Sequence, residues 1–161
     1  VVYRNNRAVH EAQPGISLRS LISELVGSFR EADGNSDLSR FTRLDVQELC
    51  VNQDVAMATT FLLTEIFDSL VSGGAADDLM ISVHADPASD AANPTAQMRM
   101  VSRRFCKGGL FDQPGGSETS GVFAGLSRQL RQPLELDRDT GVLAIRLPLV
   151  QDCCDADDDT R

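Results

Sequence analysis

The sequence has little positive charge. Its 161 residues hold 15 Lys and Arg against 24 Asp and Glu, giving a formal net charge of -9, and Lys107 is the only lysine. A nucleic-acid partner needs a concentrated basic face, because affinity comes from replacing the counterions of many phosphates. The chain offers one short basic cluster, made of Arg103, Arg104 and Lys107. We therefore expect no nucleic-acid partner.

Long hydrophobic runs are also missing. No segment approaches the ~20 apolar residues of a membrane-spanning helix, so we expect no membrane insertion of this chain. The N-terminus from Val1 lacks an initiator methionine, and it also lacks the charged n-region and the apolar h-region of a signal peptide. We therefore interpret the chain as a piece of a longer protein. The hydrophobic share of 42% and the mean hydropathy of -0.16 predict one folded domain.

Motifs for metal binding and catalysis are absent as well. The cysteines, Cys50, Cys106, Cys153 and Cys154, have no C-x-x-C spacing and no histidines at ligand intervals, so no zinc site is expected. We expect reduced thiols and a cytoplasmic protein. Neither G-x-G-x-x-G nor G-x-S-x-G occurs, and we assign no catalytic residue. Residues 151–161 are expected to form a disordered acidic tail that binds no metal.

Three helices are predicted where apolar residues recur at helical spacing. The first runs from Leu18 to Phe29, and Ser17 is a suitable N-cap. The second runs from about Asp54 to Ser72, and the third from Gly121 to Arg131. Each has one apolar stripe, so each is expected to cover a hydrophobic layer.

Short apolar or alternating segments predict the strands. They are Phe41–Val46, Glu48–Val51, Leu79–Val83, Met98–Val101, Leu134–Asp137 and Val142–Leu147. A hairpin loop is expected at residues 86–94, and a mobile, irregular loop from Cys106 to Ser120. This order favours an α+β fold, a two-layer α/β sandwich in which three helices cover one face of a mixed, mostly antiparallel sheet.

Several segments carry a resemblance that covers nearly the whole chain. They are Ala8–Glu11, the helix from Leu18 to Phe29, the strands within Phe41–Val51, and Leu63–Leu70 in the second helix. In this order they resemble the HWE/HisKA_2 branch of sensor histidine kinases, which end in a GHKL (Bergerat-type) ATP-binding domain. The resemblance implies that residues 1–13 end a truncated dimerisation helix and that residues 14–150 form the ATP-binding-type domain.

The resemblance also implies where the nucleotide pocket would lie. The N box corresponds to Thr64–Gly73, the G1 box to Val101–Gly109 and the G2 box to Ser120–Leu130. Thr140 and Gly141 stand where the family has its Gly-Thr turn. The implied pocket residues are Glu65, Ser69, Arg103, Gly121 and Gly125.

The chain departs from the family pattern inside these boxes. Glu65 keeps the N-box glutamate, whereas Ser69 replaces the asparagine that holds Mg²⁺, a change that a hydroxyl ligand tolerates in part. Arg103 stands where an aspartate accepts a hydrogen bond from the adenine amino group, and Phe105 stands at the position of the glycine near that aspartate. Arginine has only donors, and the unpaired donor costs roughly 1–3 kcal/mol. We therefore expect a degenerate pocket and no bound cofactor.

Two functions follow from the resemblance. The first is a degenerate catalytic domain, a pseudokinase, of an atypical sensor histidine kinase or phosphotransferase in two-component signalling. It would contact a response-regulator receiver domain or its own dimerisation helices, within a homodimeric parent protein. Arg103, Arg104 and Lys107 are the candidate partner-binding residues.

The second function is that of a working ATP-binding domain with a rearranged pocket. Mg-ATP would bind with its Mg²⁺ held by Glu65 and Ser69, and residues 106–120 would act as a lid. In either case His10 matches the Val-His-Glu segment near the end of the second dimerisation helix and not the phosphoacceptor histidine. The chain alone is therefore not expected to autophosphorylate.

Overall fold

The structure, a computed structural model, describes residues 15–33, 42–72, 79–112 and 116–150. A five-stranded sheet has the order β2-β4-β5-β7-β6. Its strands are β2 (Thr42–Val46), β4 (Leu79–Ala85), β5 (Thr95–Val101), β6 (Leu134–Asp137) and β7 (Val142–Pro148). Strands β2 and β4 pair in parallel, and the other neighbours pair antiparallel.

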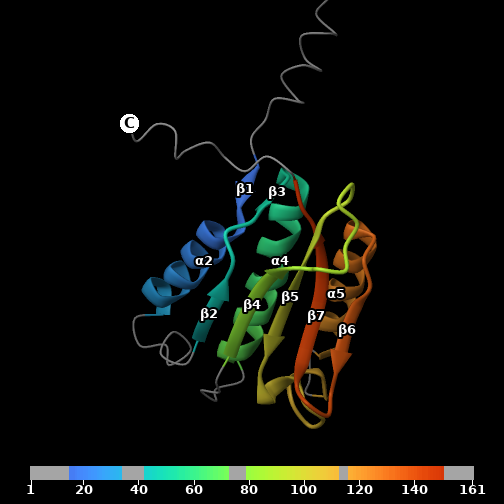
Figure 1. The fold of residues 1–161 in the computed structure, drawn as a ribbon. Helices are drawn as coiled ribbons and strands as arrows, with labels where there is room; N and C mark the ends of the chain where they lie inside the picture. Colours follow the sequence, from blue (N-terminus) through green and yellow to red (C-terminus); the bar gives the residue numbers. More distant parts are fainter. Residues whose placement is uncertain (1–14, 34–41, 73–78, 113–115, 151–161) are drawn as a thin grey trace, which may run out of the picture.

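Helices cover one face of this sheet (Figure 1). They are α2 (Leu18–Asp33), α4 (Gln53–Ser72) and α5 (Gly116–Leu130). The predicted fold class, a mixed and mostly antiparallel sheet under a layer of helices, is confirmed. Among the described residues, no helix has the length and apolar character needed to cross a bilayer.

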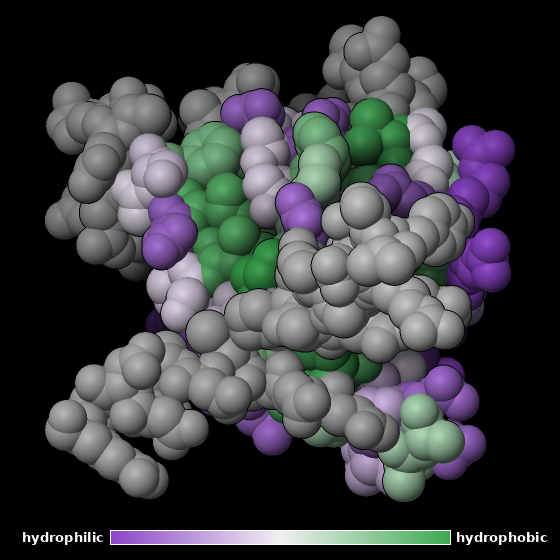
Figure 2. Space-filling view, turned by 90° about the horizontal axis from the view of Figure 1, so that it is seen from above, coloured by the Kyte–Doolittle hydropathy of each residue, from purple (hydrophilic) through white to green (hydrophobic). Residues whose placement is uncertain are grey.

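Alternation along the strands explains why only one face is covered. Leu79, Ile81 and Val83 of β4 are fully buried, whereas Met80 and His84, at alternate positions of the same strand, are exposed. Successive side chains of a strand point to opposite faces, so the apolar set lies against the helices. Seen from above, hydrophobic residues show in the interior and hydrophilic residues gather at the rim (Figure 2). The sheet therefore has one helix-covered face and one open face.

The first helix begins at the predicted cap. The backbone N–H of Ser20 donates to Ser17 Oγ at 3.2 Å, which satisfies one of the free N–H groups of the first turn. A short antiparallel pair joins β1 (Ile16–Ser17), which the sequence did not predict, to β3 (Cys50–Val51), which lies within the predicted strand Glu48–Val51. This pair joins the start of α2 to the segment that leads into α4.

The second helix begins one residue before the predicted Asp54. Its cap is Asn52, whose Oδ1 accepts a hydrogen bond from the Val55 N–H at 2.9 Å. Phe67 of α4 makes an edge-on contact with Phe29 of α2, with ring centroids 4.9 Å apart. These contacts place α4 centrally, between α2 and α5.

Two segments are more regular than predicted. Strand β5 begins at Thr95 and not at Met98, because Ala96 continues the buried alternation. The predicted loop of residues 106–120 contains the 3-10 turn η2 (Leu110–Asp112) and the first turn of α5, which begins at Gly116. That turn is polar and glycine-containing, so it lacks the apolar spacing from which helices are predicted.

The expectation of reduced thiols is wrong for Cys50, which is buried and disulfide-bonded. The other described cysteine, Cys106, is free. A disulfide joins residues that meet only in the folded chain, so local spacing did not reveal it. The cysteine-based argument for a cytoplasmic location therefore fails. The predictions for residues 1–13, His10 and residues 151–161 lie outside the described residues.

Gly141 holds the β6–β7 turn against the end of β5. Its φ is 72°, a left-handed conformation that glycine adopts without strain. Its carbonyl accepts a hydrogen bond from the Ser102 N–H at 3.0 Å, and a Cβ added here would lie 2.3 Å from the Ser102 carbonyl oxygen. Only a residue without a side chain permits this approach.

We predict that Gly141→Ala lowers the free energy of unfolding by at least about 1–3 kcal/mol, the cost of a left-handed non-glycine residue. Urea denaturation measures the change. The matched control is Gly27→Ala in α2, where an added Cβ meets nothing within 4 Å and a gain of about 0.5–1 kcal/mol is expected. Equal stability of Gly141→Ala and the wild type would contradict the role assigned to Gly141.

Candidate functional site

The three segments that resemble the nucleotide-binding boxes meet at one end of the sandwich. The C-terminal ends of α4 and β5 and the start of α5 lie at the lower end of the molecule in Figure 1. Helix α5 contacts both α4 and η2. The topology therefore brings together parts of the chain that are far apart in sequence, as a site requires.

Glu65 and Ser69 lie on the C-terminal half of α4. They are four residues apart, which places them on one face of the helix, and both are half-buried. Their neighbours Ile66 and Phe67 are fully buried in the core. The pair is thus held by a well-packed helix. Among the described residues, no group of three or more His, Cys, Asp or Glu is arranged to hold a metal ion.

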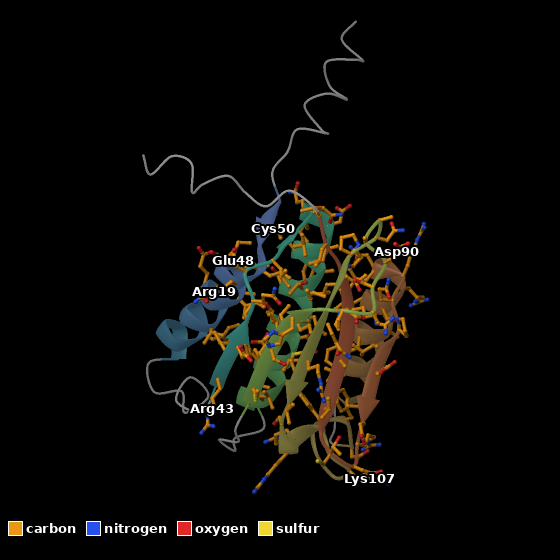
Figure 3. All side chains as sticks on the ribbon, in the orientation of Figure 1. Arg19, Arg43, Glu48, Cys50, Asp90 and Lys107 are labelled. Carbon is orange, nitrogen blue, oxygen red and sulfur yellow. The ribbon has the colours of Figure 1, made fainter. Side chains whose placement is uncertain are left out.

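The basic residues of the predicted cluster do not form one exposed patch. Arg103, in the 3-10 turn η1 (Arg103–Phe105), is exposed, but Arg104 is only 6% exposed. Lys107 projects at the lower end of the molecule (Figure 3), where its Nζ lies 3.2 Å from Asp139 Oδ1. The grouping is therefore corrected, because Arg104 points into the protein and the exposed cations are Arg103 and Lys107.

Three phenylalanines fill the junction between the end of β5 and α5. Phe105 of η1 is fully buried and packs on Phe111 of η2, with ring centroids 6.0 Å apart. Phe111 in turn contacts Phe123 of α5 edge-on at 5.6 Å. Such aromatic pairs contribute about 0.5–1.5 kcal/mol beyond their buried area. Phe105, at the position where the resemblance implies a glycine, is therefore part of the hydrophobic core.

Gly121 and Gly125 lie on α5, one turn apart. Gly121 is exposed and Gly125 is half-buried. A Cβ added at either position would meet no atom within 4 Å. Packing within the described part of the chain therefore does not require glycine at these positions.

An ionic clamp holds the segment after β5 on the β6–β7 turn. Arg138 of the turn donates a hydrogen bond to Asp112 Oδ2, and the Gly108 N–H donates to the same oxygen at 2.6 Å. The Lys107 N–H donates to the Arg138 carbonyl at 3.2 Å. The hydrogen bonds from Arg138 and Gly108 lower the pKa of Asp112 from 3.8 to about 2, and Asp112 raises the pKa of Arg138.

Sequence reasoning missed both the clamp and the aromatic cluster. Asp112 and Arg138 are 26 residues apart, and no local pattern links them. Phe123 lies in the predicted third helix, on the apolar stripe that is expected to be buried. For Phe111 the loop prediction hid the signal, because residues of a mobile loop are not expected to enter the core.

Solved structures of histidine kinases share this fold. The blue-light activated histidine kinase of Erythrobacter litoralis matches with a TM-score of 0.62 and 14% identity, over 84% of this chain and 46% of that one. The mycobacterial sensor histidine kinase MprB matches with a TM-score of 0.60 and 11% identity, over 86% and 98%. The histidine kinase AdeS of Acinetobacter baumannii gives 0.55 and 11%, over 84% and 66%.

No protein-family model and no curated relative matches the sequence. At these identities the similarity to the solved structures shows the fold alone. The chain therefore has the fold seen in histidine kinases, and it spans just under half the length of the Erythrobacter kinase chain.

The clamp predicts a pH dependence. Because the pKa of Asp112 is lowered from 3.8 to about 2 in the folded protein, its stabilisation is complete above about pH 4 and is lost as the pH falls through about 2. We expect the thermal midpoint of the wild type to fall over this window and that of Asp112→Asn to fall less. Circular dichroism at stepped pH measures both.

The control for this prediction is Asp139→Asn on the same turn. The Asp139 side chain is 79% exposed and forms an ion pair with the exposed Lys107, an arrangement that contributes little to stability. This variant should follow the wild-type profile. A profile of Asp112→Asn that coincides with that of the wild type would refute the role of the clamp.

Proposed function

We propose that this chain is a degenerate catalytic domain of a sensor histidine kinase of the HWE/HisKA_2 type. It acts in two-component signalling through contacts with other proteins, without ordinary ATP binding. The fold supports the kinase lineage, and the chemistry of the box residues supports the loss. The observation that carries the proposal is the burial of Phe105 in the aromatic cluster.

The residues present do not fit an adenine nucleotide at the family position. Arg103 is exposed and supplies only donors where the purine amino group needs an acceptor. Phe105 and Phe123, 0% and 2% exposed, occupy the junction with packed side chains. Inserting a base there would require the displacement of core residues, and close-packed cores resist such displacement. We therefore derive no catalytic step through ATP.

The proposed partners are a response-regulator receiver domain or the dimerisation helices of a homodimeric parent protein. Arg103 and Lys107 are the exposed cations of the predicted basic cluster, at the end of the sandwich where the box segments meet. Arginine binds carboxylates and phosphoryl groups in a bidentate manner, which suits an acidic partner surface. A cytoplasmic location of this part of the protein belongs to the same proposal.

A second candidate function is that of a working ATP-binding domain with a rearranged pocket. The observations that favour it are the open space beside Gly121 and Gly125 and the shared helix face of Glu65 and Ser69. In this alternative the nucleotide would bind without the contact that Arg103 has replaced. Nucleotide-dependent stability distinguishes the two functions.

We predict that millimolar Mg-ATP leaves the thermal midpoint of the chain unchanged, measured by differential scanning fluorimetry against Mg²⁺ alone. A ligand present at 100 times its Kd adds about 2.7 kcal/mol of stability to a protein that binds it only when folded. Ordinary binding would therefore produce a clear rise in the midpoint. Such a rise would favour the working domain over the degenerate one.

The variant Arg103→Asp tests the two parts of the loss separately. Arg103 is exposed, so the substitution should not unfold the protein. If the missing carboxylate alone prevents binding, the variant gains a response to Mg-ATP that Arg103→Gln, which removes the charge without supplying a carboxylate, lacks; if the positive charge alone prevents binding, both variants gain it. We expect no gain in either variant, because the aromatic cluster stays in place.

A further inference from the structure

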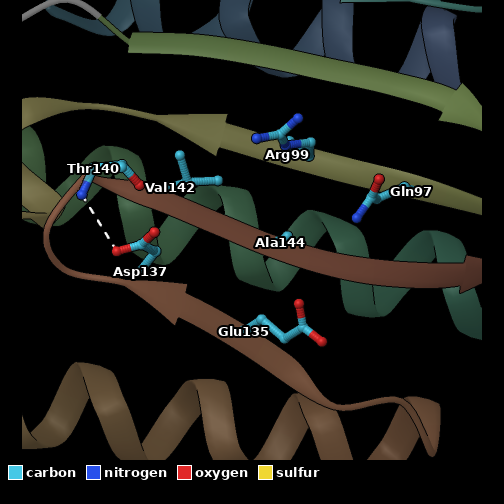
Figure 4. A pocket seen from close by; sticks show the side chains of 7 residues that line it. All are labelled: Gln97, Arg99, Glu135, Asp137, Thr140, Val142 and Ala144. Atoms are coloured by element: carbon cyan, nitrogen blue, oxygen red, sulfur yellow. Dashed lines mark hydrogen bonds between the residues drawn. The ribbon is translucent and has the colours of Figure 1, made fainter.

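The open face of the sheet has a hollow that the proposed function does not use (Figure 4). Its volume is about 350 Å³. Val142 and Ala144 of β7 form the floor, Gln97 and Arg99 of β5 form one wall, and Glu135 and Asp137 of β6 form the other. It lies on the face of the sheet that the helices leave open, so the aromatic cluster does not reach it.

The strand register explains the hollow. Arg99 of β5 and Glu135 of β6 both pair with Ala144 of β7, so these three residues form one row across the sheet. The central residue of the row is an alanine that is 7% exposed, and its methyl group lies between two long side chains. A small residue flanked by large ones leaves a depression, here with a cation on one side and an anion on the other.

The two charges of this row are unpaired in the part of the chain that the structure describes. Neither Arg99 nor Glu135 takes part in a side-chain hydrogen bond or ion pair there. By contrast, Arg146 on the same face is paired, because its Nε lies 3.4 Å from Asp86 Oδ2. The row through Ala144 therefore differs from its surroundings in having a cation and an anion that are both available to a ligand.

Asp137, by contrast, is already occupied. It accepts hydrogen bonds from the N–H groups of Asp139 at 3.0 Å and Thr140 at 3.3 Å (Figure 4). The Thr140 side chain and these bonds lower the pKa of Asp137. The carboxylate of Glu135 is therefore the one on this wall that is available to a ligand.

The row sets the charges that the ligand must carry. Neighbouring strands lie about 4.8 Å apart, so the backbones of Arg99 and Glu135 are about 10 Å apart across β7. Both side chains are long, so their rotamers, and not the strand spacing, set the gap between the two charged groups. A ligand that contacts both carries an anionic group and a cationic group, and the free α-amino acids are small molecules that carry one of each.

We propose that this hollow binds a small zwitterion of the free α-amino acid class. Arg99 and the side-chain amide of Gln97, two residues apart on the same strand face, bind the carboxylate. Glu135 accepts hydrogen bonds from the ammonium group, and Ala144 leaves room for the ligand. The site is independent of the nucleotide pocket, and it gives the domain a place to respond to a small molecule.

The test is a titration of the ¹⁵N-labelled chain with L-alanine, L-serine or L-leucine, followed by NMR. We expect saturable shifts of the backbone amides of Arg99, Ala144 and Glu135. Acetate and methylammonium each offer only one charge, so both should bind at least about tenfold more weakly. A charged hydrogen bond contributes about 1.5–3 kcal/mol, and 1.4 kcal/mol corresponds to tenfold.

Variants separate the proposed contacts from the general charge of the face. Arg99→Gln and Glu135→Gln should each weaken binding about tenfold or more, and Ala144→Val should fill the hollow and abolish it. The control is Arg146→Gln on the same face, where Arg146 Nε lies 3.4 Å from Asp86 Oδ2, and its affinity should be that of the wild type. Unsaturated shifts with all three amino acids, or equal affinity in Arg99→Gln, Glu135→Gln and Arg146→Gln, would overturn the proposal.

Discussion

The burial of Phe105 is the constraint on which the lower end of the molecule depends. This side chain, in the turn that follows β5, enters the core completely, and Phe111 and Phe123 pack in sequence behind it. The backbone that carries it is fixed in turn by Ser102, whose N–H donates to the Gly141 carbonyl. An apolar core therefore extends into the region to which the sequence resemblance assigns a nucleotide pocket.

Much of the fold was predictable because buried apolar residues recur at the regular spacing of a helix or a strand. Helices α2 and α4 and the strands of the main sheet follow apolar residues spaced as one buried face requires. The prediction failed for elements that lack regularly spaced apolar residues. The first turn of α5 is polar, β1 is only two residues long, and the disulfide of Cys50 leaves no local pattern in the sequence.

The candidate site was predictable only in part. Positions such as Glu65 and Arg103 were located by the order of elements around them, and the structure brings their segments to one end of the sandwich (Figure 1). The interactions that decide what this end does are long-range. Arg138 reaches Asp112 across the β6–β7 turn, and Arg104 turns inward while Arg103 stays exposed. Composition and spacing contain no information about either.

The lower end of the molecule thus has a junction filled by phenylalanines, and the open face of the sheet has a charged hollow. The central claim is that the filled junction excludes a nucleotide, and NMR of the wild-type chain with saturating Mg-ATP tests this claim residue by residue. We expect the backbone amides of Phe105, Gly121 and Phe123 to keep their positions throughout the titration. Saturable shifts confined to these amides would contradict the claim, because they would place a nucleotide in the junction that the phenylalanines fill.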